Sequence, residues 1–509
     1  MAHEQLDVSV EGGTVRGAAE GDLVSFKGIP FAQPPVGALR WRAPQPVKPW
    51  GGVRDASKFG PDAVQLPTAG AQNWPVSEDS LYLNVWRPAA DTGQPLPVLV
   101  WIYGGALVRG RGSRYVMDRF TRQGGMVVVS FNYRENRLGF FAHPALAAEA
   151  PDDPRGNYAY MDQIAALQWV QRNIAAFGGD PGTVTIAGES AGGGSVLALM
   201  ISPMARGLFH RAILESPGLP SPRDAVLALR SLDSAESRAV EYARDAGIDG
   251  TDGAALAALR ALPAEKVAED GVDFATAVVE YAGGPQIPGF TASMVDGRLI
   301  VERPEAALRG ARQAMVPVIC GANNFDLAPS VAETKDAVFA QFGTLAPQAR
   351  ELYDPAGDAS LKALVQAVYA DRTMIEPTRH LAAAMTRAGQ PAYYYRFSYV
   401  DEAYRGQLPG AIHGLEIPYA YDMPVGFDGK EFVLLERKGA DQEMTRAVSG
   451  YWANFVRTGD PNDAGLPDWP RYDPATGNVL DFTVTGVNAG PDPLKARLDL
   501  WQSVWEPAG

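Results

Sequence analysis

The chain has 509 residues, of which 46% are hydrophobic and 20% charged, so it can bury a large core and is not a disordered or low-complexity protein. Its formal net charge of −14 disfavours nucleic acid and anionic membranes as partners. No run approaches the roughly 18 to 20 consecutive apolar residues that a membrane-spanning helix needs.

Two further features of the sequence bear on the compartment. Residues 1–7 lack the basic and apolar regions of an export signal. Cys320 is the only cysteine, so no internal disulfide can form, which fits a reducing compartment. We therefore expect a cytoplasmic protein, and the sequence leaves its oligomeric state open.

Short β-rich apolar runs alternate with helical stretches along the chain. This alternation predicts an α/β fold with a largely parallel sheet covered by helices. No linker interrupts it, so residues 1–509 are expected to form a single domain. Between the second and third runs, apolar residues recur at helical spacing from Met161 to Ile174, and Gly178 and Gly179 follow as a stop signal. The runs are residues 98–103, 126–131, 183–187, 212–215, 316–320 and 393–397.

The first run leads directly into Tyr103-Gly104-Gly105-Ala106. Glycines at the end of a strand let the chain turn and aim its backbone N–H groups inward. A Gly-Gly pair alone would equally suit a tight turn without function.

The third run leads into Gly188-Glu189-Ser190-Ala191-Gly192 and then into an apolar helix at residues 195–200. A serine hydroxyl is a poor nucleophile, so an enzyme that uses one exposes it on a strained strand-to-helix turn beside a base and hydrogen-bond donors. The pattern predicts that Ser190 is a nucleophile. The N–H groups of Gly105, Ala106 and Ala191 are the candidate donors to the oxyanion of a tetrahedral intermediate.

Residues 221–268 are rich in alanine and acidic residues, and their helical spacing is broken at Gly247, Gly250 and Pro263. We interpret residues 221–310 as a helical, cap-like insertion near the site. Two readings stay open, a cap over the pocket and helices that merely cover the sheet.

The nucleophile needs a base, and the chain has five histidines. In the α/β-hydrolase topology the order is serine, acid, histidine, which excludes His3 and His143. His210 lies just before the next strand and His380 lies inside a helical stretch, so both suit surface or packing positions. His413 follows the last of the six runs in a loop with Pro409 and Gly410, and is the candidate base.

An acid must orient that imidazole. Asp326 follows the run at residues 316–320 and lies in a polar loop, where a strand terminus is expected. Glu333 and Asp336 are the alternatives, although they look like exposed positions of the next segment.

Several long motifs, in one order, resemble the type B carboxylesterase/cholinesterase family of the α/β-hydrolase fold. The resemblance covers nearly the whole chain. The motifs are FKGIPFAQPPVGALRWRAPQP (26–46), SEDSLYLNVWRP (77–88), WIYGGA (101–106), NYR (132–134), the segment 177–193, GLFHRAILES (207–216), AIHGLEIPY (411–419) and YWANFVRTGDPN (451–462).

The resemblance implies Ser190 as nucleophile, His413 as base, and an oxyanion hole of Gly105, Ala106 and Ala191. It also implies that Glu189 helps to shape the electrostatics of the site. Two further pairs resemble structural ion pairs of the family, Arg40 with Glu78 and Arg134 with Asp162.

Three positions depart from the family pattern. The acid is usually glutamate, whereas the matching residue here is Asp326, which is one methylene shorter. Ser80 stands where the family has a cysteine, so the nearby disulfide is missing. Ala106 replaces the third oxyanion glycine, which leaves its N–H available while its methyl narrows the site.

We therefore expect a serine carboxylic-ester hydrolase that acts through an acyl-enzyme on small or medium hydrophobic esters, without metal or cofactor. Hydrolysis of amides, thioesters or carbamates is the alternative, because the same residues do not select the leaving group. Adhesion proteins that resemble this family have lost the nucleophile, whereas this chain keeps Ser190 and His413, which disfavours a non-catalytic role. Trp74 lies near the motif at residues 77–88, but its spacing to that motif differs from that of the family's choline-binding tryptophan. We therefore expect no strong preference for choline esters. The acyl and alcohol pockets depend on residues 60–77, 217–288 and 325–346.

Overall fold

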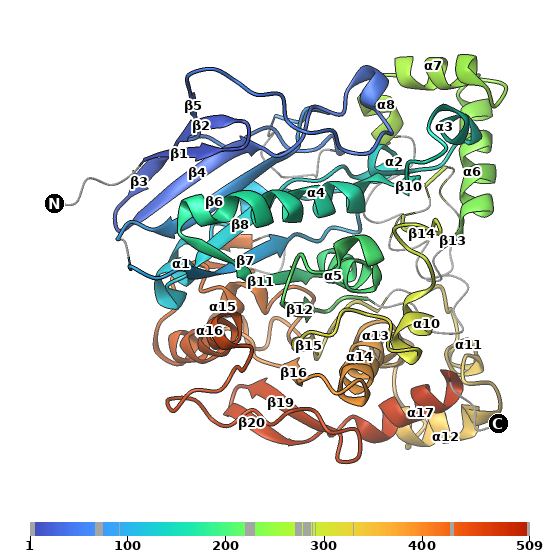
Figure 1. Ribbon diagram of the computed structural model, residues 1–509. Helices are drawn as coiled ribbons and strands as arrows, with labels where there is room; N and C mark the ends of the chain where they lie inside the picture. Colours follow the sequence, from blue (N-terminus) through green and yellow to red (C-terminus); the bar gives the residue numbers. More distant parts are fainter. Residues whose placement is uncertain are drawn as a thin grey trace.

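An eleven-stranded sheet runs through the molecule, from the blue N-terminal part to the red C-terminal part (Figure 1). The structure is a computed structural model, and it describes residues 6–66, 75–90, 92–218, 230–269, 277, 287, 289–290, 292–328, 330–427 and 432–505. From one edge to the other the strands are β20 (Gly486–Pro491), β19 (Asn478–Thr483), β16 (Ala392–Phe397), β15 (Val318–Asn323), β12 (Arg211–Glu215), β11 (Gly179–Glu189), β7 (Leu96–Ile102), β8 (Val127–Phe131), β6 (Tyr82–Pro88), β4 (Leu23–Pro30) and β3 (Ala18–Glu20).

The middle of this sheet is parallel. Strands β19, β16, β15, β12, β11, β7 and β8 pair parallel with one another in that order. Antiparallel pairs join β20 at one edge and β6, β4 and β3 at the other. Each of the six apolar runs falls on a strand of the parallel part, which confirms the mostly parallel sheet. The antiparallel edge strands were not predicted from the sequence.

Small sheets flank the large one. They comprise β1 (Asp7–Val10), β2 (Gly13–Arg16) and β5 (Val53–Asp55), the pair β9 (Phe140–Phe141) and β10 (Gly156–Asn157), the pair β13 (Arg230–Ser231) and β14 (Met294–Val295), and the pair β17 (Val425–Phe427) and β18 (Phe432–Leu434).

The covering helices pack in two groups. In the first group, α5 packs on β11 and β12, α14 packs on β15 and β16, and α4 and α10 pack beside α5. In the second group, α16 packs on β7 and β11 and contacts α1 and α15. The helices are α1 (Asp118–Gly124), α2 (Asn136–Gly139), α3 (Pro144–Glu149), α4 (Tyr158–Asn173), α5 (Ala191–Ile201), α6 (Leu232–Asp245), α7 (Gly253–Ala261), α8 (Ala264–Glu269), α10 (Pro304–Arg309), α11 (Lys335–Ala340), α12 (Ala346–Tyr353), α13 (Leu361–Ala370), α14 (Glu376–Arg387), α15 (Ile417–Ala420), α16 (Gly439–Thr458) and α17 (Lys495–Trp505).

The apolar spacing predicted in the sequence produces helix α4, whose Met161, Ile164 and Leu167 are buried. The segment stops at Gly178, which adopts the left-handed conformation with φ of 81°. Gly179, expected to be part of the stop signal, instead begins strand β11. Gly178 therefore ends the helical segment, and Gly179 starts the next strand.

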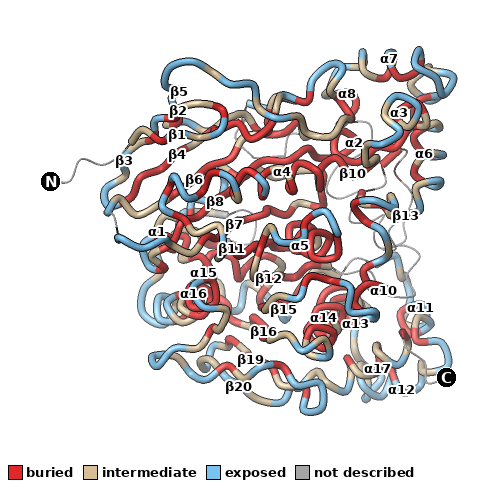
Figure 2. Tube along the Cα trace, viewed as in Figure 1, coloured by how far each residue is buried: buried red, intermediate tan, exposed pale blue. Residues whose placement is uncertain are grey.

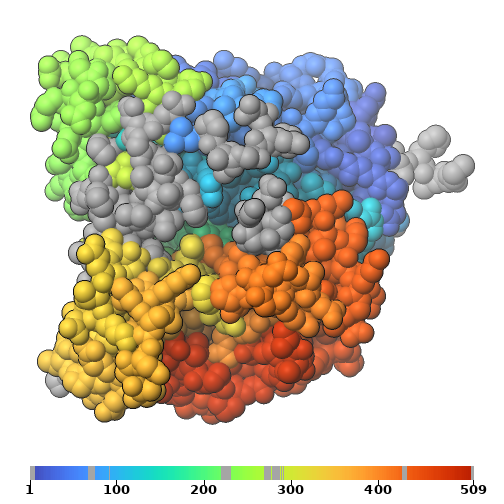
Figure 3. Space-filling model, turned by 180° about the vertical axis from the view of Figure 1, so that it is seen from behind, coloured from blue at the N-terminus to red at the C-terminus, as the bar shows by residue number. Residues whose placement is uncertain are grey.

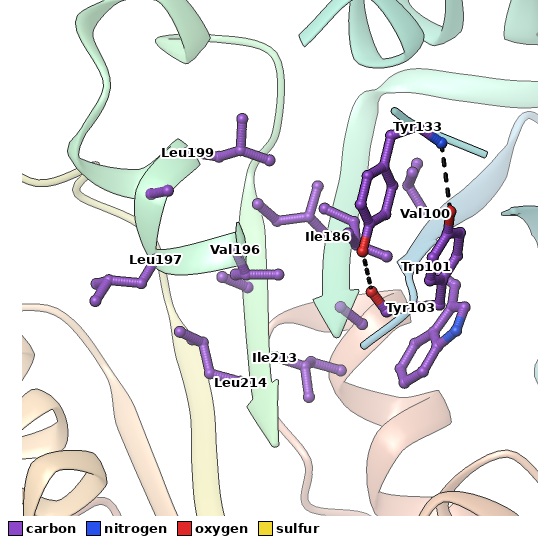
Figure 4. Close-up of a cluster of buried hydrophobic side chains, with 14 of the residues drawn as sticks. Val100, Trp101, Tyr103, Tyr133, Ile186, Val196, Leu197, Leu199, Ile213 and Leu214 are labelled. Atoms are coloured by element: carbon purple, nitrogen blue, oxygen red, sulfur yellow. Dashed lines mark hydrogen bonds between the residues drawn. The ribbon is translucent and has the colours of Figure 1, made fainter. Parts of the chain in front are cut away.

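The core lies along the middle strands, which are red over most of their length in Figure 2. Figure 4 shows part of it: Ile186 of β11 lies near Val196 and Leu199 of helix α5, Ile213 comes from the neighbouring strand β12, and Trp101 of β7 lies farther from the helix. All five side chains are fully buried. This apolar packing fixes the ends of the strands from which the site is built.

Helices α6, α7 and α8 occupy the described part of the predicted insertion, with breaks at Gly247, Gly250 and Pro263 as expected. Helix α6 packs on β9 and β14, α7 on α3, and α8 on α2. Residues 219–229 and 270–276 lie outside the described residues, so a cap over the pocket stays a prediction. None of the helices in the described ranges is long and apolar enough to cross a membrane.

Candidate active site

Ser190 lies on a sharp turn between a strand and a helix. Strand β11 ends at Glu189 and helix α5 begins at Ala191. Ser190 itself has φ of 57° and ψ of −127°, a conformation that non-glycine residues rarely adopt. Its backbone N–H donates to the carbonyl oxygen of Glu215, 2.9 Å away, which ties the turn to strand β12. The strand, turn and helix expected around the nucleophile are all present.

Close backbone contacts explain the glycines around this turn. A Cβ atom added to Gly192 would lie 2.1 Å from the carbonyl oxygen of Ile102, at the end of β7. One added to Gly104 would lie 2.9 Å from Cβ of Ser190. The Gly-Gly segment after β7 and the turn after β11 are therefore in direct contact.

The segment after β7 is held in place by an aromatic pair. Tyr103 and Tyr133 stack with their ring centroids 4.4 Å apart, and the Tyr133 hydroxyl donates to the Tyr103 carbonyl oxygen over 2.7 Å (Figure 4). Gly105 and Ala106 then take positive φ values of 119° and 56°.

Three backbone N–H groups remain available at this point. Among the hydrogen bonds of the described residues, those of Gly105 and Ala106 donate to no protein acceptor. Ala191 is the first residue of α5, where an N–H has no partner within the helix. Unsatisfied N–H groups next to a nucleophile suit the binding of an oxyanion.

Asp326 and His413 meet although 87 residues separate them in the sequence. His413 Nδ1 lies 2.6 Å from Asp326 Oδ1, and the Asp326 side chain is fully buried. The other carboxylate oxygen, Oδ2, accepts hydrogen bonds from the Ser216 hydroxyl at 2.6 Å and the Asn323 N–H at 3.0 Å. Burial alone would raise the pKa of Asp326, but the charge of His413 and these hydrogen bonds hold it below its ordinary value.

The other candidates for base and acid lie elsewhere. His143 Nδ1 accepts from the N–H of Ala145 and caps helix α3. His210, just before β12, accepts at Nδ1 from the N–H of Val184 in β11. His380 lies within α14, as predicted. The two alternative acids, Glu333 and Asp336, are exposed.

Glu189 adds a second carboxylate to the imidazole. His413 Nε2 lies 3.2 Å from Glu189 Oε1. Burial lowers the pKa of His413, but the carboxylates of Glu189 and Asp326 outweigh burial and raise it to about 10. Burial raises the pKa of Glu189 to about 7, against the lowering effect of the His413 charge. The two side chains therefore compete for one proton near neutral pH.

A cavity of about 660 Å³ opens onto these residues, and both Ser190 and His413 line it. One wall is apolar and comes from the 325–328 and 412–425 segments: Phe325, Leu327, Ala328, Ile412, Leu415, Ile417, Pro418, Met423 and Val425. The lining also includes Gln65, Arg109, Arg111, Arg114 and Tyr115. Figure 3 shows the face opposite to that of Figure 1, where cyan and teal segments lie recessed between blue and orange ones.

Sequence reasoning missed several residues of this site. Ser216 holds the candidate acid, and Gln366 of α13 donates from Nε2 to the Asp326 carbonyl oxygen over 2.6 Å. The three arginines were missed as well, although the run Arg109-Gly110-Arg111-Gly112-Ser113-Arg114 is a visible basic signal in an acidic chain. Of the regions expected to form the pockets, Gln65 and residues 325–328 line the cavity. Trp74 lies outside the described residues.

The two ion pairs that the resemblance implies are present. Arg40 contacts Glu78 at 2.6 Å, and Arg134 contacts Asp162 at 2.8 Å. In the part of the chain that the structure describes, no three His, Cys, Asp or Glu side chains are grouped so that they could hold a metal ion.

Comparison with known proteins places these features in context. Residues 4–501 match the model of the carboxylesterase family. The fumonisin B1 esterase of Sphingopyxis macrogoltabida is 35% identical over 503 residues, covering 96% of this chain and 88% of that protein. A medium-chain fatty acyl-CoA hydrolase precursor of Anas platyrhynchos is 34% identical and covers 99% of this chain and 93% of that protein.

Solved structures give the same result. A PNB esterase superposes with a TM-score of 0.80 at 28% identity, covering 99% of this chain and all of that chain. A carboxylesterase of Geobacillus stearothermophilus superposes with a TM-score of 0.77 at 31% identity, covering 98% of this chain and all of that chain.

Proposed function

Because this chain belongs to the carboxylesterase family, a family of serine ester hydrolases, we propose that Ser190, His413 and Asp326 hydrolyse carboxylic esters as a catalytic triad. The observation that carries this assignment is the 2.6 Å contact between His413 Nδ1 and Asp326 Oδ1 in the cavity that Ser190 lines. An imidazole held through Nδ1 by a buried carboxylate presents Nε2 to accept a proton.

The reaction proceeds in two halves. His413 Nε2 takes the proton of the Ser190 hydroxyl while Oγ attacks the ester carbonyl, and the oxyanion that forms accepts hydrogen bonds from the N–H groups of Gly105, Ala106 and Ala191. The C–O bond to the alcohol then breaks, and His413 protonates the departing oxygen. In the second half a water molecule, deprotonated by His413, releases the acid from Ser190 by the same route.

Asp326 acts through its two oxygens. Oδ1 accepts the Nδ1–H of the imidazole and stabilises the imidazolium that forms in each half-reaction. Oδ2 accepts hydrogen bonds from the Ser216 hydroxyl and the Asn323 N–H, which fix the orientation of the carboxylate. The apolar wall of the cavity supports our expectation that the hydrocarbon part of the ester binds there.

The first test is Ser190→Ala, assayed with 4-nitrophenyl esters of increasing acyl length and with a fluorophosphonate label. We expect labelling to vanish and kcat to fall by about a million-fold, because the nucleophile is removed. Ser503→Ala, which changes an exposed serine of α17, is the matched control. Asp326→Asn should slow labelling and lower kcat by about 10⁴, because the imidazole is no longer held in the tautomer that accepts the serine proton. Full turnover by Ser190→Ala would refute the proposal.

Thioester hydrolysis is a second candidate, supported by the similarity to a protein named as a fatty acyl-CoA hydrolase. The same triad attacks esters and thioesters alike. Comparing kcat/KM for a 4-nitrophenyl ester and for the coenzyme A thioester of the same acid distinguishes the two.

A further inference from the structure

Tyr133 is a fully buried residue next to the chain segment of the proposed oxyanion hole. Its ring packs on that of Tyr103, which is equally buried, and neither is among the described residues that line the catalytic cavity. Tyr103 is the first residue after strand β7, and the turn at residues 104–106 follows it directly. Tyr133 takes no part in the reaction steps proposed above.

The carbonyl group of Tyr103 is held by a donor and by close packing. The Tyr133 hydroxyl donates to its oxygen over 2.7 Å (Figure 4). Helix α5 begins so close to it that a Cβ atom on Gly192 would lie 2.9 Å from the same oxygen. Burial raises the pKa of Tyr133 well above its ordinary value, so the hydroxyl stays protonated and remains a donor. A buried carbonyl that loses its donor is left unsatisfied, which favours a different orientation of the peptide.

The turn that follows is strained, and the segment of Tyr133 also anchors its far end. Gly105, Ala106 and Leu107 have positive φ values of 119°, 56° and 62° in succession. Non-glycine residues keep such a conformation only where the surrounding structure holds them in it. The N–H of Asn136 donates to the Leu107 carbonyl oxygen over 2.7 Å. Tyr133 and Asn136 therefore hold the chain before and after the two candidate oxyanion donors.

Stacking keeps the Tyr133 hydroxyl opposite this carbonyl. The two tyrosine ring planes are 16° apart, and their centroids are separated by 4.4 Å. The N–H of Tyr133 donates in return to the Tyr103 hydroxyl, over a long distance of 3.5 Å. A Cβ atom on Gly110 would lie 2.4 Å from the Tyr103 ring, so this ring is closely packed as well. Donors that are fixed before the reaction need little reorganisation when charge develops.

We propose that Tyr133 is a positioning residue of the oxyanion hole, which acts through the Tyr103 carbonyl. Its hydroxyl fixes the peptide from which the chain turns, and thereby the directions of the N–H groups of Gly105 and Ala106. The inference rests on the proposed function and deepens it. Because the oxyanion forms only during the reaction, Tyr133 should contribute to the stability of the transition state and little to the binding of the ester.

Tyr133→Phe removes the hydroxyl and keeps the ring, so it isolates the bond to the Tyr103 carbonyl. With a 4-nitrophenyl ester we expect kcat to fall by about tenfold to a hundredfold and KM to change by less than about twofold. Tyr451→Phe is the matched control, because the Tyr451 hydroxyl donates to the backbone carbonyl of Pro467 over 2.5 Å and neither residue is described as lining the cavity. Both variants lose one such bond, so their urea midpoints should fall similarly, whereas kcat should fall only in Tyr133→Phe.

Two ketones measure the oxyanion hole separately from turnover. Hexyl trifluoromethyl ketone forms a tetrahedral adduct with a nucleophilic serine, and the oxyanion of this adduct occupies the same hole. Hexyl methyl ketone has the same chain and a much less electrophilic carbonyl. In Tyr133→Phe we expect Ki for the fluorinated ketone to rise by the factor by which kcat/KM falls, and Ki for the methyl ketone to stay unchanged. Replacing Tyr133 with 4-aminophenylalanine, which keeps a donor at the end of the ring, should restore most of both losses.

The outcomes separate this inference from the proposed function. If Tyr133→Phe keeps the wild-type kcat, if its KM rises in place of a fall in kcat, or if Tyr451→Phe loses as much turnover, the positioning role is refuted and the esterase stands. A 4-aminophenylalanine variant that is folded but as slow as Tyr133→Phe would also refute it. If the unaltered protein hydrolyses no ester and binds both ketones equally, the proposed function itself fails.

Discussion

At the scale of single residues, His413 is set between two carboxylates that have different roles. Asp326 is buried and hydrogen-bonded, so it stays charged and orients the ring. Glu189, 3.2 Å from the other ring nitrogen, has a raised pKa and can hold a proton near neutrality. Both carboxylates therefore raise the pKa of the ring, and Glu189 is the one whose own pKa of about 7 lies near neutrality.

This balance predicts the effect of Glu189→Gln on the pH profile. A base must be neutral to accept a proton, so activity rises as pH increases through the pKa of His413. The Glu189 carboxylate stabilises the imidazolium and raises that pKa, so its removal lowers it. The acid limb of the kcat/KM profile should move to lower pH by about one unit. Glu302→Gln, in an exposed ion pair with Arg312, should leave the limb in place; a limb that moves to higher pH would contradict this account.

At the scale of elements, the site depends on how tightly strands β7 and β11 and helix α5 approach one another. Gly188 and Gly192 flank Ser190, and no side chain fits at either position because backbone atoms fill the space. The strained conformation of Ser190 is held by packing around it, as expected where strain is part of a site.

Gly192→Ala should therefore damage both stability and activity. The added methyl would meet the Ile102 carbonyl oxygen at 2.1 Å, so strand and helix must separate, which we expect to cost about 3 kcal/mol of unfolding free energy or more. Urea denaturation and esterase assays measure the two effects. Gly253→Ala, where the new methyl meets nothing within 4 Å at the start of α7, is the control. Wild-type stability in Gly192→Ala would show that the turn is looser than described.

Elements whose structure is determined by neighbouring residues in the sequence were predictable. The β-branched runs became β7, β8 and β11, and the G-x-S-x-G turn became the strained turn at Ser190. Antiparallel edge strands such as β3 and β20 were missed because they are short and carry little apolar periodicity. Contacts such as Ser216 with Asp326 join residues 110 positions apart, and such pairing has no local signal. The three arginines of the cavity had a local signal, yet only the fold brings their segment to the cavity that Ser190 lines.

At the scale of the whole molecule, a second apolar cluster is connected to Asp326, the proposed acid, through helix α13. Trp501 of α17 packs on Phe342 with ring centroids 4.2 Å apart, and the cluster includes Leu364 and Val368 of α13. The same helix α13 carries Gln366, which holds the backbone of Asp326. The C-terminal helix is thus connected to the site through one intervening element.

Trp501→Ala should therefore lower stability and, indirectly, turnover. Removing this buried ring should cost about 3 to 5 kcal/mol in urea denaturation, and a looser α13 should reduce kcat more than it raises KM. Trp501→Phe loses the hydrogen bond from Nε1 to the Tyr353 hydroxyl but keeps a buried ring. It should therefore retain most of the stability and most of the turnover. A Trp501→Ala protein within 1 kcal/mol of the wild type would show that this cluster is independent of the rest.

The positions of the three proposed triad residues along the chain have a consequence for biosynthesis. Ser190, Asp326 and His413 follow β11, β15 and β16, so the proposed triad is spread over more than two hundred residues of the chain. A nascent polypeptide on the ribosome exposes its nucleophile long before its base emerges. The emerging chain therefore cannot attack cellular esters until synthesis has passed residue 413, and hydrolytic activity begins only when the fold is nearly complete.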